Sequence, residues 1–451
     1  MLHCFSLDGM RLVLDVNSGA VHVVDEPAWF LLRCLSEGRS LAEAVSGALA
    51  AGLDPLAVDG ATGEIRELAA EGRLLAPDPC GPDYLPPPKP LRALCLHLAH
   101  DCNLRCAYCF AGQGRFGGGA ALMPPAVGRR AIDYLFSASG AYKEVEVDFF
   151  GGEPLLNFPV LRDLVLYARE LEAGFGKRVN FTVTTNGLLL NDEVTAFLNA
   201  QGLQAVLSLD GRPGVHDRMR SLASGRGSYA EVAPRIKGFV ESRDGRNCYV
   251  RGTYTRYNTD FTADFRHLAA MGFGTVSLEP VVASPDAPYA LGGDDYQVLA
   301  AEYERLARGL VAGEYPFSRF FHFELNLDDG PCLAKRVTGC GAGAEYLAVD
   351  PGGELYPCHQ FVGRGDYRLG NIWTGVTRPD LVSRFHAGHV MNKEDCRACW
   401  ARFFCGGGCH ANNLAATGDM QKPGTLYCLL VRKRIECALI LKARAAGAAA
   451  V

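Results

Sequence analysis

The chain has 451 residues, more than one hydrophobic core usually organises, so its length predicts two or three domains. A net charge of -5 without a dense Lys/Arg stripe argues against a nucleic-acid partner, and no basic tract borders an apolar helix as in proteins of the membrane surface. Because we find neither a signal peptide nor a run of spanning length, we expect a cytoplasmic protein. Its 17 cysteines should then be reduced and bind metal rather than form disulfides.

Residues 1–76 are predicted to form a small module. Apolar and polar residues alternate over Phe5–Asp15 and Ala20–Val24 around an Asn-Ser-Gly turn, which is the pattern of a β-hairpin. Amphipathic helices are expected over Pro27–Ser36, Leu41–Ala51 and Gly63–Glu71. A hairpin followed by three short helices predicts a winged-helix-like unit, and the Pro- and Gly-rich residues 77–90 are expected to be a linker.

Residues 91–326 alternate short apolar runs with helical patterns. The strand candidates are Leu94–Leu98, Val145–Phe150, Val179–Thr184, Ala205–Leu209, Tyr249–Tyr254 and Val276–Val281. The alternation predicts an α/β fold in which parallel strands, joined by crossover helices, form a barrel or part of one. Ligands of such a barrel bind at the carboxyl ends of its strands.

Residues 327–451 differ in character, because nine cysteines and many glycines lie among few long periodic segments. Metal sites are therefore expected to replace much of the hydrophobic core in this last region.

A three-cysteine loop, Cys102, Cys106 and Cys109, directly follows the first barrel strand with the spacing CxxxCxxC. Three thiolates can hold a cubane and leave one iron open, whereas zinc normally needs a fourth protein ligand, for which His97 or His100 is available. With an aromatic residue before the last cysteine, the loop resembles the radical S-adenosylmethionine (SAM) signature. The resemblance implies a partial (β/α)6 barrel and a [4Fe-4S] cluster whose open iron binds SAM.

The same resemblance implies a set of SAM-contacting residues near the ends of the barrel strands. They are Tyr108, Gly151, Gly152, Glu153, Asn186, Ser208 and Asp210. A Gly-Gly turn lets the backbone approach a ligand closely, although GGEP alone would be only a turn. Ser208 and Asp210 could equally be helix caps.

The C-terminal cysteines continue as Cys340, then Cys358, then Cys396-x2-Cys399-x5-Cys405-x3-Cys409, then Cys428. This pattern resembles the SPASM arrangement of peptide-modifying radical SAM enzymes, which implies two auxiliary [4Fe-4S] clusters and three in all. The implied ligands are Cys340, Cys358 and Cys409, with Cys332 as a possible fourth, for the first cluster. Those implied for the second are Cys396, Cys399, Cys405 and Cys428. Two structural zinc sites are the alternative, because Cys-x2-Cys is half of a zinc knuckle.

Three segments, Leu12–Asp25, Gly341–Val349 and Tyr356–Phe361, resemble the maturases of the Cys-rich SCIFF peptide. That resemblance implies thioether bonds in a small Cys-rich precursor peptide, and an electron donor such as a flavodoxin or ferredoxin. The N-terminal module resembles the peptide-recognition element of ribosomal peptide maturation, in which a leader peptide adds as a strand. A DNA-binding winged helix or a merely packed domain is the alternative.

Three other functions compete with thioether formation. Sulfatase-maturing relatives carry an Asp directly after the cysteine equivalent to Cys358, as a base. Here the position is His359, which argues against the aldehyde-forming reaction, although a His could serve as the catalytic base. Another SPASM peptide-modifying oxidase is a second rival. The non-enzymatic rival is an iron-sulfur electron carrier or leader-binding scaffold.

Overall fold

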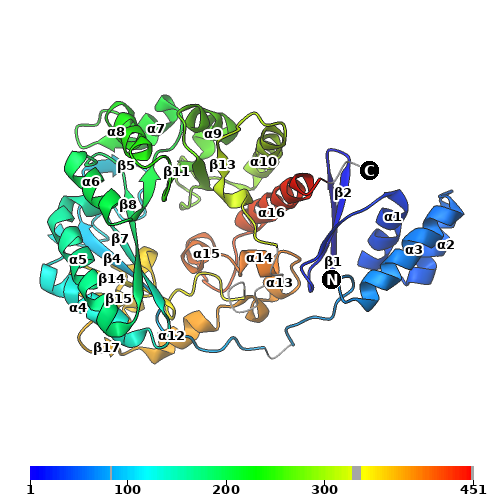
Figure 1. Cartoon of the computed structure of the whole chain (residues 1–451), viewed down its shortest axis with the longest axis horizontal. Coiled ribbons are helices and arrows are strands. Elements are labelled where there is room, and N and C mark those ends of the chain that lie inside the picture. The colour runs from blue at the N-terminus through cyan, green and yellow to red at the C-terminus, as the bar shows by residue number, and fades with distance from the viewer. Residues whose placement is uncertain (82–83, 328–336, 448–451) are drawn as a thin grey trace.

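The computed structural model describes residues 1–81, 84–327 and 337–447. It begins with a sheet in which β1 (Leu2–Leu7), β2 (Met10–Asp15) and β3 (Val21–Val23) pair antiparallel in that order. The helices α1 (Glu26–Ser36), α2 (Leu41–Ala50) and α3 (Pro55–Ala70) follow the sheet (Figure 1). Apolar side chains of the three helices pack against one face of the sheet, around Val13.

Two local signals change the boundaries expected for this module. The strand expected over Phe5–Asp15 is two strands, because Asp8 and Gly9 turn with φ of 50° and 77°. Asp-Gly is a favoured hairpin turn. Helix α3 begins earlier than expected because the Asp54 carboxylate accepts a hydrogen bond from the Ala57 amide, and a proline occupies the first turn.

All six strands expected in the central region are present and parallel. They are β4 (Ala93–His100), β7 (Glu144–Gly151), β8 (Arg178–Thr185), β9 (Gln204–Ser208), β11 (Cys248–Tyr254) and β12 (Thr275–Pro280). They are neighbours in chain order, with the helices outside (Figure 1). Those helices are α4 (Pro125–Ala138), α5 (Phe158–Phe175), α6 (Asp192–Ala200), α7 (Pro213–Met219), α8 (Tyr229–Glu241), α9 (Phe261–Ala270) and α10 (Tyr296–Val311).

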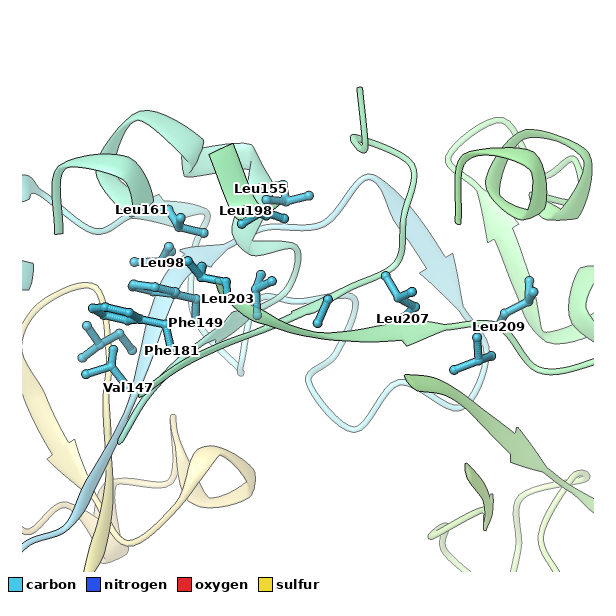
Figure 2. Packing of buried hydrophobic residues seen from close by; sticks show 14 of the residues in the cluster. Leu98, Val147, Phe149, Leu155, Leu161, Phe181, Leu198, Leu203, Leu207 and Leu209 are labelled. Carbon is cyan, nitrogen blue, oxygen red and sulfur yellow. The ribbon is translucent and has the colours of Figure 1, made fainter. Parts of the chain in front are cut away.

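The largest core lies between these strands and helices. Figure 2 shows Leu161 of α5 and Leu198 of α6 over the strand residues Phe149 and Phe181, whose rings stack with centroids 5.7 Å apart. Apolar burial of this kind fixes the strands, and therefore the loops that follow their carboxyl ends.

Short strands extend the sheet at both ends. Beyond β12 lies β13 (Arg319–Phe320), and at the other end β14 (Tyr346–Val349) adds parallel to β4. The antiparallel strands β15 (Glu354–Tyr356), β16 (Gly370–Asn371) and β17 (Gly375–Val376) follow β14, and β6 (Ala121–Leu122) pairs with β4. The sheet therefore uses chain on both sides of residue 327, where the composition changes.

The Cys-rich region forms short helices and one long one. They are α12 (Pro379–His386), α13 (Glu394–Arg397), α14 (Arg402–Cys405), α15 (His410–Thr417) and α16 (Thr425–Ala445). Helix α16 lies between α10 and the N-terminal module (Figure 1). In that module, His3 stacks on Trp400 with centroids 3.7 Å apart, and Leu12 shares a core with Leu439. Among the described helices, none is long and apolar enough to cross a bilayer.

Candidate active site

One cavity of about 530 Å3 opens at the carboxyl ends of the barrel strands. Its wall contains all three cysteines of the loop and three from the C-terminal region: Cys102, Cys106, Cys109, Cys405, Cys409 and Cys428. The other predicted residues on the wall are Tyr108, Gly151, Gly152, Asn186, Ser208 and His359. Glu153 and Asp210 are fully buried and lie outside the wall. The cavity thus brings together cysteines from both ends of the sequence.

The cysteine loop is held by a two-stranded antiparallel pair that the sequence did not reveal. Strand β5 (Leu104–Cys106) belongs to the loop itself and pairs with β10 (Arg220–Leu222), so that Cys106 faces Arg220. The Ala107 amide donates to the Met219 carbonyl at 2.8 Å, which continues the contact beyond the pair. The position of the loop therefore depends on the segment after α7.

A buried network connects this loop to strand β9. The Tyr108 hydroxyl donates to Asp210 Oδ2 at 2.5 Å, and Arg220 donates to the same hydroxyl at 3.0 Å. Burial raises the pKa of Asp210, while Arg220 opposes that shift. The Nε of Arg220 is buried without a hydrogen-bond partner among the described residues. Asp210, which was expected to contact SAM, accepts a hydrogen bond from the Tyr108 hydroxyl in the structure and lies 3.7 Å from the Arg220 guanidinium.

The GGEP turn is built to pack against the cysteine loop. A Cβ on Gly151 would lie 2.3 Å from the Ala99 carbonyl oxygen, and one on Gly152 would lie 2.1 Å from that of Asp101. The Glu153 carboxylate accepts hydrogen bonds from the Thr185 hydroxyl and the Asn186 amide, both at 2.8 Å. Burial raises the pKa of Glu153 to about 7, although these hydrogen bonds oppose the shift. Glu153 therefore orders the end of β8, including Asn186 on the cavity wall, without lining the cavity itself.

The hydrogen bond from its backbone amide to the Glu153 carboxylate fixes Asn186 beside the cysteine loop. Its side-chain amide donates to Asn103 Oδ1 at 2.7 Å and lies 3.7 Å from the Cys102 sulfur. Ser208, the last residue of β9, lines the cavity as well. Both positions suit contact with a ligand beside the cysteines.

The thiols of the loop suit a metal centre. Burial raises the pKa of Cys102 to about 12 and also raises that of Cys106, where Arg220 opposes the shift. Such thiols become thiolates when a metal supplies the compensating charge. In the described part of the chain, no three His, Cys, Asp or Glu side chains are arranged to hold a single metal ion.

The two histidines considered as zinc ligands pair with each other instead. His97 Nδ1 lies 3.2 Å from His100 Nε2, and neither residue lines the cavity. Burial lowers the pKa of His97 well below its usual value and that of His100 to about 4, so both rings are neutral.

Thiols within each of the two sets that the resemblance implies act on one another electrostatically. Burial raises the pKa of Cys358, and the thiols of Cys409 and Cys340 raise it further. Burial likewise raises the pKa of Cys396 to about 12; Lys393 opposes this shift, and the thiols of Cys405, Cys428 and Cys399 add to it. Cys332 lies outside the described residues.

Three glycines join the two sets between Cys405 and Cys409. Gly406, Gly407 and Gly408 have φ of 70°, 87° and 75°, a left-handed run that other residues avoid. The chain can therefore pass from one set to the other within a few residues.

His359 lies between the first auxiliary set and the cysteine loop. Its ring centroid is 4.8 Å from that of Phe150 and 5.8 Å from that of Phe110, and the Tyr346 hydroxyl is 3.4 Å from its Nδ1. Burial and the nearby Arg251 lower the pKa of His359 to about 4, so the ring is neutral at physiological pH.

Charged residues on the cavity wall were missed from the sequence. Glu279 Oε1 lies 2.8 Å from His322, and its other oxygen lies 3.5 Å from Arg434. Burial favours a high pKa for Glu279, but His322, Arg434 and Arg251 outweigh it and hold the pKa well below its usual value. A signal was available for Arg251, because it interrupts an otherwise uncharged predicted strand.

Comparisons with known proteins find similar iron-sulfur and maturase sequences. A family model described as a 4Fe-4S single cluster domain matches residues 91–232, which include the cysteine loop. The serine-type anaerobic sulfatase-maturating enzyme of Klebsiella aerogenes is 23% identical over 355 residues, 75% of this chain and 84% of that protein. Mycofactocin maturase MftC of Mycobacterium ulcerans is 27% identical over 337 residues, 70% of this chain and 83% of that protein.

Solved structures share the fold. Native anSMEcpe with bound AdoMet matches with a TM-score of 0.65 at 19% identity, over 79% of this chain and 100% of that one. Streptococcus suis SuiB bound to S-adenosylmethionine matches with a TM-score of 0.53 at 16% identity, over 94% and 98%. The partial-barrel α/β fold is confirmed, and the sequence is similar to those of anaerobic sulfatase-maturating enzymes and a mycofactocin maturase.

Proposed function

We propose that this protein is a radical SAM enzyme that forms thioether cross-links in a small Cys-rich precursor peptide. The observation that best supports the proposal is the shared cavity, in which the loop of Cys102, Cys106 and Cys109 faces Cys405, Cys409 and Cys428. A peptide in that space would lie between two groups of cysteine thiols that are available to bind metal. We propose that three [4Fe-4S] clusters occupy these thiols.

Bound at the loop, SAM and a reduced cluster would supply a 5′-deoxyadenosyl radical, with methionine as the other product. Asn186, Ser208 and the turn at Gly151 would hold SAM beside the loop. Arg220 and Asp210 would hold the loop itself through Tyr108.

Cross-linking would remove two hydrogens from the peptide. One leaves a peptide carbon and ends in 5′-deoxyadenosine; the other leaves the thiol as a proton, while one electron passes to an auxiliary cluster. His359 lines the cavity with an uncharged ring, and we propose that it accepts the thiol proton.

The N-terminal module would bind the leader of the peptide. Strand β3 has no strand on its outer side in the described part of the chain, so a peptide can add there by backbone hydrogen bonds. The opposite edge strand, β1, contacts α16. Because the N-terminal module packs against the Cys-rich region, a leader peptide bound to β3 would be held at a fixed distance from the cavity.

Mass spectrometry of the product tests this function. The reconstituted protein, with SAM, a flavodoxin or chemical reductant and a Cys-rich peptide, should give a peptide lighter by two hydrogens per cross-link. Each cross-link should also protect one cysteine from alkylation after reduction. An aldehyde that a hydrazide reagent traps would instead indicate the sulfatase-maturing reaction. An unmodified peptide despite SAM cleavage would contradict the peptide-modifying function.

A further inference from the structure

Lys393 is a buried cation between the two auxiliary cysteine sets. Its side chain is only 3% exposed, and its ammonium donates to the Gly407 carbonyl at 2.8 Å. Gly407 is the middle residue of the glycine run that joins Cys405 of one set to Cys409 of the other. The carbonyl of Lys393 also accepts from the Cys396 amide at 3.0 Å, so both ends of the residue are tied to cysteine-bearing segments.

A buried ammonium needs negative charge nearby. The carboxylate of Asp419 favours the charged form of Lys393 less strongly than the neighbouring cysteine thiols do. Burial lowers the pKa of Lys393, while the thiols of Cys396, Cys405 and Cys409 favour its charged form. An unpaired buried charge is unfavourable, so the cysteines, once a metal has ionised them, are the partners that the site offers.

We infer that Lys393 is a counter-ion shared by both auxiliary clusters and that it raises their reduction potentials. The inference rests on the proposed function, because it needs iron-sulfur clusters at these cysteines. A thiolate-bound cluster becomes more negative when it accepts an electron, and a fixed cation beside it stabilises the reduced form. Lys393 would thus help the auxiliary clusters to take the electron that bond formation releases.

Lys393→Met and Lys393→Arg test the inference, because the first removes the charge at similar size and the second keeps it. Both variants would be made in a protein whose Cys102, Cys106 and Cys109 are already replaced by Ala. Only the auxiliary clusters would then contribute to the electron paramagnetic resonance signal. Lys433→Met is the matched control, since its ammonium already pairs with Glu436 at 2.9 Å and Glu304 at 3.1 Å.

An electrochemical titration followed by electron paramagnetic resonance gives the readout. For Lys393→Met we expect the ratio of oxidised to reduced cluster at a given potential to be at least ten times larger. A tenfold change corresponds to a reduction potential about 59 mV lower for a one-electron couple. Lys393→Arg and Lys433→Met should change that ratio less than threefold. Loss of auxiliary iron from Lys393→Met alone would also support a counter-ion.

The inference would be overturned if Lys393→Met and Lys393→Arg shifted the reduction potential equally or lost equal amounts of iron. It would also be overturned if neither variant shifted the potential, and Lys393 would then have only a packing role. Zinc in place of iron in the parent protein would instead refute the proposed clusters. Metal analysis before the titration therefore separates the two failures.

Discussion

Arg220 lies directly opposite Cys106 across the pairing of β5 with β10, and its guanidinium donates to the Tyr108 hydroxyl at 3.0 Å. Two residues of the cysteine loop therefore depend on one buried arginine. Asp210, with its carboxylate 3.7 Å from that guanidinium, supplies the countercharge. The consequences of this network can be measured without substrate.

Replacing Asp210 by Asn should destabilise the loop strongly. The change leaves Arg220 buried without a charge partner, which typically costs about 3–5 kcal/mol. Urea unfolding of the metal-free protein should show this loss, and the reconstituted variant should hold less iron. Asp163→Asn is the control, because its partner Arg129 is about half exposed and such a pair contributes about 1 kcal/mol or less. Equal stability of the two variants would refute the role of the network.

Gly152→Ala should displace the cysteine loop. Its new methyl would meet the Asp101 carbonyl at 2.1 Å, and backbone on both sides leaves little room to yield. We expect at least a tenfold loss of SAM binding, measured by equilibrium dialysis. Gly174→Ala, at a helical position with nothing within 4 Å, should keep binding and stabilise α5 by roughly 0.5–1 kcal/mol. Unchanged SAM binding in Gly152→Ala would show that the close approach is not needed.

Val23→Pro should impair leader binding. The Val24 amide donates to Arg11 of β2, so the alternation of a strand turns the Val23 amide to the free edge. Proline there removes an outward donor and is tolerated at an edge. We expect KM for the peptide to rise about tenfold or more, while SAM cleavage without peptide is unchanged. Val23→Thr keeps the amide and should behave as the parent protein; an unaltered KM in Val23→Pro would place the leader elsewhere.

Deleting residues 1–76 is a poorer test of leader binding than an edge variant. Phe5 and Leu12 of the module share a hydrophobic core with Ile435 and Leu439 of α16, and His3 stacks on Trp400. Removing the module would uncover that apolar surface beside the second auxiliary set. A loss of both activities would then report damage to the Cys-rich region rather than the function of the module.

The sequence was most informative where the chemistry is local. Alternating apolar runs predicted the six barrel strands, because that signal lies within short segments. The ligand sets expected from the cysteine spacing stay predictions. Arg220 and Lys393 could not be predicted, since their roles arise from pairing and burial between distant segments. The SAM contacts expected of Glu153 and Asp210 stay predictions; only the fold shows that both side chains are fully buried and lie outside the cavity wall. The strand β14 was missed because so short a strand gives little periodicity.

The most direct test of the account is reductive SAM cleavage by the anaerobically reconstituted protein, with 5′-deoxyadenosine measured by liquid chromatography. The parent protein should hold iron for three clusters, roughly twelve atoms per chain, and produce 5′-deoxyadenosine. The variant with Cys102, Cys106 and Cys109 changed to Ala should keep about two thirds of that iron and produce none, because only this loop is proposed to bind SAM. Continued 5′-deoxyadenosine production by the triple variant would contradict the assignment of the catalytic cluster.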